Sequence, residues 1–228
     1  MRGLSDAVHA FLKTRYFQPL VFALCAYPLA SLLKNAIPVL LPAFFPEATV
    51  PWTGDLGVNP SQALLRETGR DAFLVLLASL SVTPIRRLTG WNRVQLVRRT
   101  IGVWAFVYAL CHFTTYVVFD QVGDVASIAE DVFKRRFIFV GMLAFLILLS
   151  LALTSTNGMM RRLGRRWQRL HRLVYVAAIA GSVHFIWGQK ADIREPLWWA
   201  TVLSLLLGLR LFFFIRRRSG ARVLSVSH

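Results

Sequence analysis

Six long apolar runs, separated by arginine-rich segments, restrict this chain to very few folds. Inside a bilayer only helices and closed barrels satisfy the backbone polar groups, and apolar runs of about 20 residues are typical of membrane-spanning helices. The chain is 56% hydrophobic over 228 residues, and the excess lies in these runs. We therefore predict an all-α membrane protein, a single domain over residues 1–228 that forms a six-transmembrane helical bundle. The predicted spans are 17–34, 71–82, 101–119, 137–153, 174–187 and 197–215.

Prolines set the expected ends of the first two spans. Proline removes a helical hydrogen bond, so Pro84 is expected to end the second span, which is short. The stretch 37–51 carries four prolines and is expected to leave the helix and lie along the outer interface. The first span is interpreted as retained rather than as a cleaved signal peptide, because Pro19 and Pro28 interrupt it and no small-residue cleavage pattern is clear. We find no repeat of fixed period.

The basic residues indicate an orientation. The net charge of +16 would suggest a nucleic-acid partner in a soluble protein. Here the charge lies between apolar runs, so membrane lipids are the expected counter-surface and no nucleic acid is expected. In a six-span arrangement most basic residues fall on one side, and the positive-inside rule makes that side cytoplasmic, with both termini inside. Lys134, Arg135 and Arg136 are an exception on the outer side.

Two histidines lie at matching depth in different spans. His112 follows Arg99 by 13 residues and His184 follows Arg172 by 12, so each lies roughly 18–20 Å inside the cytoplasmic edge, in the outer half of the bilayer. Imidazoles are expensive in a bilayer and are common metal ligands. A single one is more often a hydrogen-bonded structural residue, but two at one depth suit a haem that takes one axial ligand from each helix.

His171 lies about 20 Å from His184 along the same helix, at the cytoplasmic edge. The matching position on the third span is Arg99, which is not a plausible iron ligand. His171 therefore ligates a second haem iron with a different partner or alone, or it contacts a quinone or a flavin. The chain has no C-x-x-C-H motif, so any haem is expected to be non-covalent.

Arginines near the outer ends of the spans are candidate partners for the haem propionates. A planar guanidinium suits a carboxylate, and we hypothesise that Arg70, Arg135 or Arg136 takes this role. The alternative is that these side chains extend to the outer lipid headgroups.

Two connecting segments have a further possible use. Segment 159–172 is expected to be one interfacial amphipathic helix that anchors in lipid, or that also docks an anionic redox donor or a flavin phosphate. The acidic loop 120–131 is either simply exposed to solvent on the outer side or a docking site for a soluble partner. Arg210, near the cytoplasmic end of the last span, receives no role.

Several motifs resemble one known family. They are TGRDAF (68–73), LSVTPIRRL (80–88), RRTIGVWAFVYALCH (98–112), WQRLHRLVY (167–175) and HFIW (184–187). In order and spacing they resemble the MsrQ (YedZ) family, whose members are haem-binding membrane subunits with a ferric-reductase-like transmembrane domain. The resemblance covers about residues 15–215.

The resemblance implies a place and a function. The family lies in the bacterial inner membrane, binds haem b, and includes members described with FMN. It takes electrons from the quinone pool or a cytoplasmic flavin reductase and passes them to a periplasmic molybdopterin-containing catalytic subunit (MsrP-like) that reduces methionine sulfoxide. The family's haem-associated histidines match His112, His171 and His184, with one haem or two.

Two other functions stay open. One is a stand-alone transmembrane metal (ferric) reductase that uses the same histidines, and the less favoured one is a small transporter. The chain has no glycine fingerprint for a dinucleotide and no soluble flavin domain. We therefore expect an electron-transfer subunit that has no catalytic residue of its own and needs both a donor and an acceptor.

Overall fold

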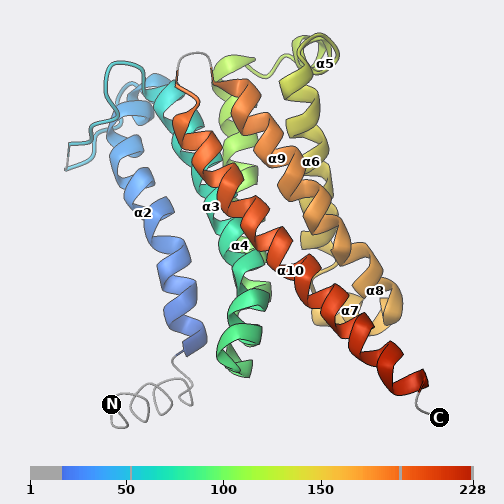
Figure 1. The fold of residues 1–228 in the computed structure, drawn as a ribbon. Coiled ribbons are helices and arrows are strands. Elements are labelled where there is room, and N and C mark those ends of the chain that lie inside the picture. The colour runs from blue at the N-terminus through green and yellow to red at the C-terminus, as the bar shows by residue number, and fades with distance from the viewer. Residues whose placement is uncertain (1–16, 52, 190–191, 227–228) are drawn as a thin grey trace.

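The computed structural model describes residues 17–51, 53–189 and 192–226, and it is built from helices that run along one another (Figure 1). Six of them are long and apolar enough to cross a membrane, which confirms the predicted all-α six-span bundle. The spanning elements are α2 (Phe17–Phe44), α3 (Pro60–Thr89), α4 (Arg98–Thr115) with its π-helical extension η2 (Tyr116–Asp120), α6 (Arg136–Leu153), α8 to α9 (Arg165–Gly188), and α10 (Arg194–Val226).

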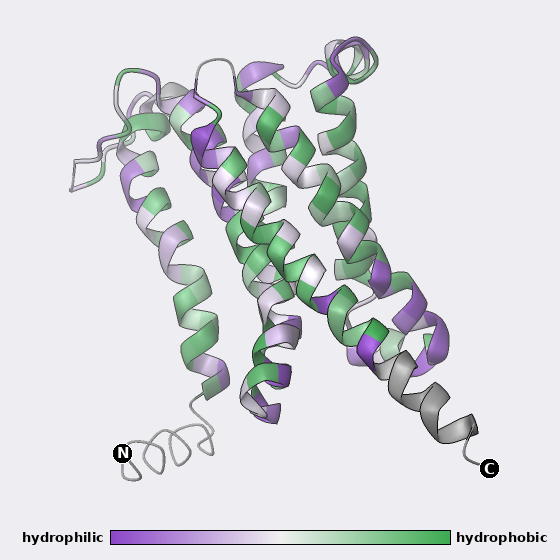
Figure 2. Ribbon diagram, in the orientation of Figure 1, coloured by the Kyte–Doolittle hydropathy of each residue, from purple (hydrophilic) through white to green (hydrophobic). Residues whose placement is uncertain are grey.

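The shorter elements lie at the two ends of the bundle. The apolar residues occupy the middle of the spans, whereas α7 (Asn157–Leu163) and α8 (Arg165–Leu170) are strongly polar (Figure 2). The helix α5 (Val125–Lys134) lies across the opposite end (Figure 1). The elements η1 (Asn92–Leu96), η3 (His171–Leu173) and α9 (Val174–Gly188) complete the described chain. The beginning of α2 and the last turns of α10 lie at the same end as α7 and α8 (Figure 1).

The core lies between two helix pairs, α3 with α4 and α6 with α9. Its centre contains Phe73, Leu77 and Leu80 of α3, and it is lined by fully buried Ala105 and Ala177. Inside a bilayer the hydrophobic effect does not drive helices together, and small residues allow the close packing that stabilises their contact. Helices α2 and α10 pack on the outside of this group and expose apolar side chains, as lipid-facing helices do.

The predicted end of the first span is wrong. Helix α2 continues through Pro28, Pro38 and Pro42 to Phe44, so much of the stretch 37–51 is helical and does not lie along the interface as predicted. Beside Pro28 a side chain from another helix bonds the backbone of α2. The Tyr108 hydroxyl on α4 accepts from the Leu29 N–H (2.9 Å) and donates to the Cys25 carbonyl (2.8 Å). These two backbone groups would normally bond each other, so a side chain from another helix has entered the ladder.

The predicted bounds of the second span are also wrong. Helix α3 begins at Pro60, where Asn59 caps it through the Gln62 N–H, and it passes Pro84 to end at Thr89. Pro84 cannot donate to the Leu80 carbonyl, but Arg210 Nη2 on α10 lies 2.5 Å from that oxygen and donates in its place. Neighbouring helices can thus satisfy backbone groups that proline leaves free.

The two connecting segments also differ from expectation. The predicted single amphipathic helix over 159–172 is broken at Gly164, whose φ of +50° favours glycine, so α7 and α8 are separate short helices. The acidic segment 120–131 is largely the helix α5 rather than a loop. Asp131 ties this helix to the end of the third span by accepting from Tyr116 Oη (3.1 Å) and Gln121 Nε2 (2.8 Å).

Candidate haem site

His112 near the end of α4 and His184 in α9 face each other across the bundle. Their ring centroids are 6.0 Å apart, with an angle of 78° between the ring planes. With metal–nitrogen bonds of about 2 Å, two imidazoles on opposite sides of one iron have centroids roughly 6 Å apart. The spacing therefore fits a single metal between the two rings.

Backbone carbonyls fix the tautomer of both histidines. His112 Nδ1 lies 2.8 Å from the Leu65 carbonyl oxygen of α3, and His184 Nδ1 lies 2.7 Å from the Phe137 carbonyl oxygen of α6. A carbonyl can only accept, so each Nδ1 carries the proton and each Nε2 keeps a lone pair for a metal. Both rings are therefore oriented so that Nε2, in the neutral imidazole, is free to bind a metal.

The donor set suits a haem better than a bare metal ion. A protein-bound zinc ion takes three or four protein ligands, and the described residues contain no group of three or more His, Cys, Asp or Glu side chains that could hold a metal. A porphyrin provides four nitrogens itself and needs only axial ligands from the protein. His112 and His184 are the residues that would provide them.

A glycine lies against each histidine ring. A Cβ atom on Gly69 would be 2.7 Å from His112 Nδ1, and one on Gly141 would be 2.5 Å from His184 Nδ1. Each glycine lies one turn after the residue whose carbonyl bonds the same ring. The neighbouring helix therefore leaves room for the ring at the glycine and fixes its orientation through the carbonyl. Sequence reasoning missed both glycines.

We expect Gly141→Ala to displace the His184 ring, because the added methyl overlaps Nδ1 and contacts below 3.0 Å force a shift. The purified variant should retain less than half of the wild-type haem per protein, or show an altered low-spin spectrum. Gly208→Ala is the matched control, since a Cβ there meets nothing within 4 Å. Equal haem content and identical spectra for both variants would contradict this role of Gly141.

These features recur after 72 residues, so the absence of a repeat inferred from the sequence is wrong. Leu65, Gly69 and His112 correspond to Phe137, Gly141 and His184. The sequence GRDAFLVLL (69–77) corresponds to GMLAFLILL (141–149), with identical residues at six of the nine positions. Helices α3 and α4 form one copy and α6 and α9 form the other. Two copies in a background of apolar residues give only a weak periodic signal.

Aromatic contacts show how the two copies meet. Phe73 of α3 packs edge-on against Phe185 of α9 (6.0 Å), and Phe145 of α6 stacks on Phe113 of α4 (4.6 Å). Exchanging the two copies converts one pair into the other and exchanges His112 with His184. A pseudo-two-fold axis thus passes between the two imidazoles, where a single iron would be ligated equivalently from both sides.

His171 lies away from this pair, in the 3-10 turn η3. Its ring stacks on Trp167 (3.8 Å between centroids), Nδ1 is 3.1 Å from the Trp167 carbonyl oxygen, and Nε2 is 3.4 Å from Ser155 Oγ. Its equivalent in the first copy is Arg99, which donates to Asn157 Oδ1 (2.5 Å). The described residues place no second imidazole opposite His171, so its role as a ligand stays a prediction.

Two of the three predicted propionate partners already contact carboxylates. Arg70 Nε lies 2.8 Å from Glu195 Oε1, although their alignment is too poor for a hydrogen bond, and Arg135 Nε lies 2.9 Å from Asp131 Oδ1. Arg136 is exposed and forms no ion pair with the described residues. Arg70 follows Gly69 and Arg136 precedes Phe137, so both are next to the backbone that holds a histidine. Their pairing with propionates stays a prediction.

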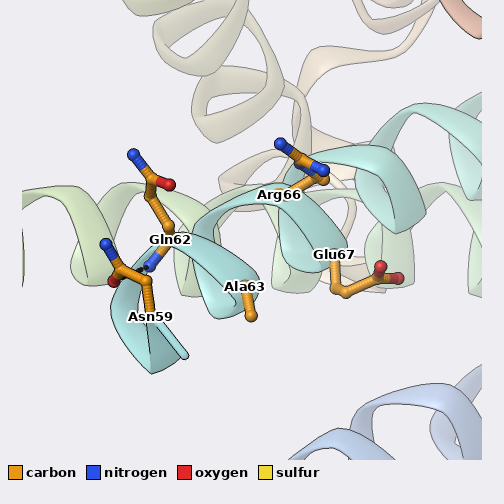
Figure 3. Close-up of a pocket in the computed structure, with 5 residues that line it drawn as sticks. All are labelled: Asn59, Gln62, Ala63, Arg66 and Glu67. Atoms are coloured by element: carbon orange, nitrogen blue, oxygen red, sulfur yellow. Dashed lines mark hydrogen bonds between the residues drawn. The ribbon is translucent and has the colours of Figure 1, made fainter. Parts of the chain in front are cut away.

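A hollow at the start of α3 is a surface feature of one helix. Asn59, Gln62, Ala63, Arg66 and Glu67 line it, and Gln62 and Arg66 project on the same side of the helix (Figure 3). Asn59 caps the helix, and the other lining residues all come from the first two turns of α3, so the hollow is shallow. It offers no enclosed space for a cofactor, and we assign it no function.

The fold and the paired imidazoles agree with a known class of membrane domain. The family described as the ferric reductase like transmembrane component matches residues 68–182, which contain both copies of the repeat apart from their ends. The fold and site thus define a ferric-reductase-like transmembrane domain in a multi-pass membrane protein.

Comparison with individual proteins narrows the class. The chain is 43% identical over 203 residues to the protein-methionine-sulfoxide reductase heme-binding subunit MsrQ of Herminiimonas arsenicoxydans, covering 87% of this chain and 93% of that protein. Identity is 48% over 170 residues with MsrQ of Rhodospirillum rubrum (74% and 82%), and 40% over 205 residues with MsrQ of Bordetella pertussis (86% and 100%). The chain belongs to the MsrQ family, as its motifs indicated.

Proposed function

We propose that this chain binds haem b between His112 and His184 and serves as the electron-transfer subunit of a methionine sulfoxide reductase system. The observation that carries the proposal is the pair of imidazoles, 6.0 Å apart, whose Nδ1 atoms are both held by carbonyls. The relatives are named as heme-binding subunits of such a system, and they supply the biological setting. A haem bound there supplies one-electron redox chemistry.

The remaining residues give the proposed transfer a direction. His171 and the arginines of α7 and α8 lie at the end where we place electron entry, from the quinone pool or a cytoplasmic flavin reductase, with FMN as a possible carrier. We place electron exit at the end covered by α5, because Tyr116, one turn beyond His112, bonds Asp131 of that helix. The proposed acceptor there is a periplasmic molybdopterin-containing subunit, with the chain in the inner membrane.

The test begins with the spectrum of the purified full chain and continues with its partners. We expect reduced-minus-oxidised bands of a six-coordinate haem b. We also expect reduction by a quinol analogue or a flavin reductase, and reoxidation by the candidate periplasmic subunit only when methionine sulfoxide is present. A haem-replete preparation without such bands would overturn the proposal. Reoxidation by ferric chelates but not by the periplasmic subunit would instead support the stand-alone metal reductase.

Arg136 provides a separate prediction about the tuning of the haem. A positive charge near the propionates stabilises the reduced, more negative haem, so Arg136→Gln should lower the midpoint potential measured by redox titration. Arg161→Gln removes the same charge from α7 at the other end and should leave that potential unchanged. If both variants match the wild type, Arg136 is an ordinary surface arginine.

A further inference from the structure

Arg210 has more hydrogen-bonding capacity than the fold uses. It lies within the last span, where Nη2 donates to the Leu80 carbonyl and Nη1 donates to the Tyr175 hydroxyl, both at 2.5 Å. The bond to Leu80 is explained by Pro84, which cannot donate to that oxygen. The charge of the guanidinium is only partly compensated by these contacts, because the carbonyl and the hydroxyl are neutral and the Tyr175 ring, 5.1 Å from Cζ, offers its π face rather than an anion.

No acidic group of the described chain balances this charge. Arg98 and Arg87 are near enough to act on Arg210 electrostatically, and both are positive. The segments that form this end of the bundle, 79–99, 154–175 and 197–216, contain no Asp or Glu. None of the ion pairs among described residues includes Arg210. A cation inside a span pairs with an opposite charge or with backbone carbonyls; Arg210 has the Leu80 carbonyl but no anion among the described residues.

Donors without acceptors gather at the same place. Arg210 Nε is buried and has no hydrogen-bond partner among the described residues. The Tyr175 hydroxyl accepts from Arg210, and the described residues show no acceptor for its own proton. Thr83, three residues after Leu80 and so on the same face of α3, also has a buried hydroxyl with no partner in this part of the chain. Leaving buried donors unpaired is destabilising, so a bound acceptor at this place would be favoured.

We propose that Arg210, Tyr175 and Arg98 form a binding site for a phosphate group between α3, α4, α9 and α10, with Arg87 at its rim. A phosphate provides negative charge together with several acceptor oxygens, and a guanidinium matches it with two parallel bonds. Basic pockets between spans at the cytoplasmic side are typical sites for lipid headgroups. The site does not depend on the proposed haem or on electron transfer.

The phosphate can come from an anionic lipid or from a small phosphorylated molecule. Arg210 lies six residues before Arg216, the end of the last span, which is about 9 Å along the helix axis. A site at that depth is less than two helical turns from the headgroup layer. The next residues, Leu211 and Phe212, are more than half exposed and offer apolar surface to acyl chains.

The first test compares lipids on the purified full chain. In nanodiscs of phosphatidylcholine with a minor fraction of phosphatidylglycerol, native mass spectrometry should show that the wild type retains phosphatidylglycerol preferentially. Arg210→Gln should weaken this retention at least tenfold, and Tyr175→Phe several-fold. Arg166→Gln is the matched control, because it removes the same charge from α8 without touching the site. Equal retention by Arg210→Gln and the wild type, or no preference for phosphatidylglycerol, would count against a lipid phosphate.

A second arm identifies the source of the phosphate. If inorganic phosphate raises the thermal unfolding midpoint of the wild type in neutral detergent but not that of Tyr175→Phe, the ligand is a small phosphorylated molecule. If only phosphatidylglycerol does so, the ligand is a lipid. If neither acts on the wild type differently from the variant, the proposal is overturned. Tyr175→Phe decides even where Arg210→Gln fails to fold, since it leaves the bond to Leu80 in place.

Discussion

Replacing His184 or His112 by alanine is expected to abolish the low-spin haem spectrum. Each replacement removes one of two imidazoles that face each other at 6.0 Å, and no other histidine among the described residues lies against either ring. The pseudo-two-fold arrangement predicts that the two variants behave alike, because each histidine has the same carbonyl and glycine partners. Pyridine haemochrome content and the reduced-minus-oxidised spectrum measure the effect, which we expect to be a loss of at least 90% of the signal of this haem.

His171→Ala is the matched control for these two variants. It removes a histidine that lies in η3 against Trp167, away from the proposed site, so the spectrum of the haem between His112 and His184 should persist. Free imidazole should partly restore the low-spin spectrum of His184→Ala, which would separate loss of a ligand from misfolding. A six-coordinate spectrum of wild-type intensity in His112→Ala or His184→Ala would show that the proposed pairing is wrong.

The number and type of spans, and the pairing of the two histidines in space, could be predicted from the sequence. Hydropathy reports the spans directly. The regular rise of a helix converts residue counts from the basic edges into depth, which placed His112 and His184 together. Neither the spans nor the depth depends on how the helices turn about their own axes, and the expectation that the two imidazoles share one metal supplied the rest.

The partners of the histidines could not be predicted in the same way. The Leu65 and Phe137 carbonyls and the glycines one turn later matter only because α3 faces α4 and α6 faces α9 in one particular register. That register depends on the packing of many side chains between neighbouring helices. The 72-residue repeat was the signal in the sequence that could have indicated it, since it places both glycines at the same distance from a histidine.

The helix ends were mispredicted at the prolines for a related reason. A local rule assigns each proline the cost of a lost bond. At Pro84 a distant side chain donates in place of the missing N–H, and beside Pro28 a distant hydroxyl inserts between the next bonded pair, the Leu29 N–H and the Cys25 carbonyl. Tyr108 follows the affected residues of α2 by about 80 positions, and Arg210 follows Leu80 by 130. A membrane protein can keep a proline within a span where a neighbouring helix supplies a polar group at that point.

Tyr108→Phe is therefore expected to destabilise the protein far more than the loss of one hydroxyl at a surface. Tyr108 is fully buried, and its hydroxyl holds the Leu29 N–H and the Cys25 carbonyl of α2. Without it both backbone groups lie unpaired beside Pro28, and each unpaired buried group costs about 1–3 kcal/mol. We expect the free energy of unfolding in detergent to fall by about 2–4 kcal/mol.

The same substitution at Tyr27 isolates the role of the inserted hydroxyl. Tyr27 lies on α2 next to Pro28 but is 72% exposed. Tyr27→Phe should therefore change the free energy of unfolding by less than about 0.5 kcal/mol. Because Tyr108 lies one turn before His112, loosening α2 also uncovers one side of the helix that carries His112. Tyr108→Phe should thus lose haem faster to apomyoglobin than Tyr27→Phe does. Equal unfolding free energies for the two variants would mean that α2 restores its own ladder at Pro28 and that Tyr108 only fills space.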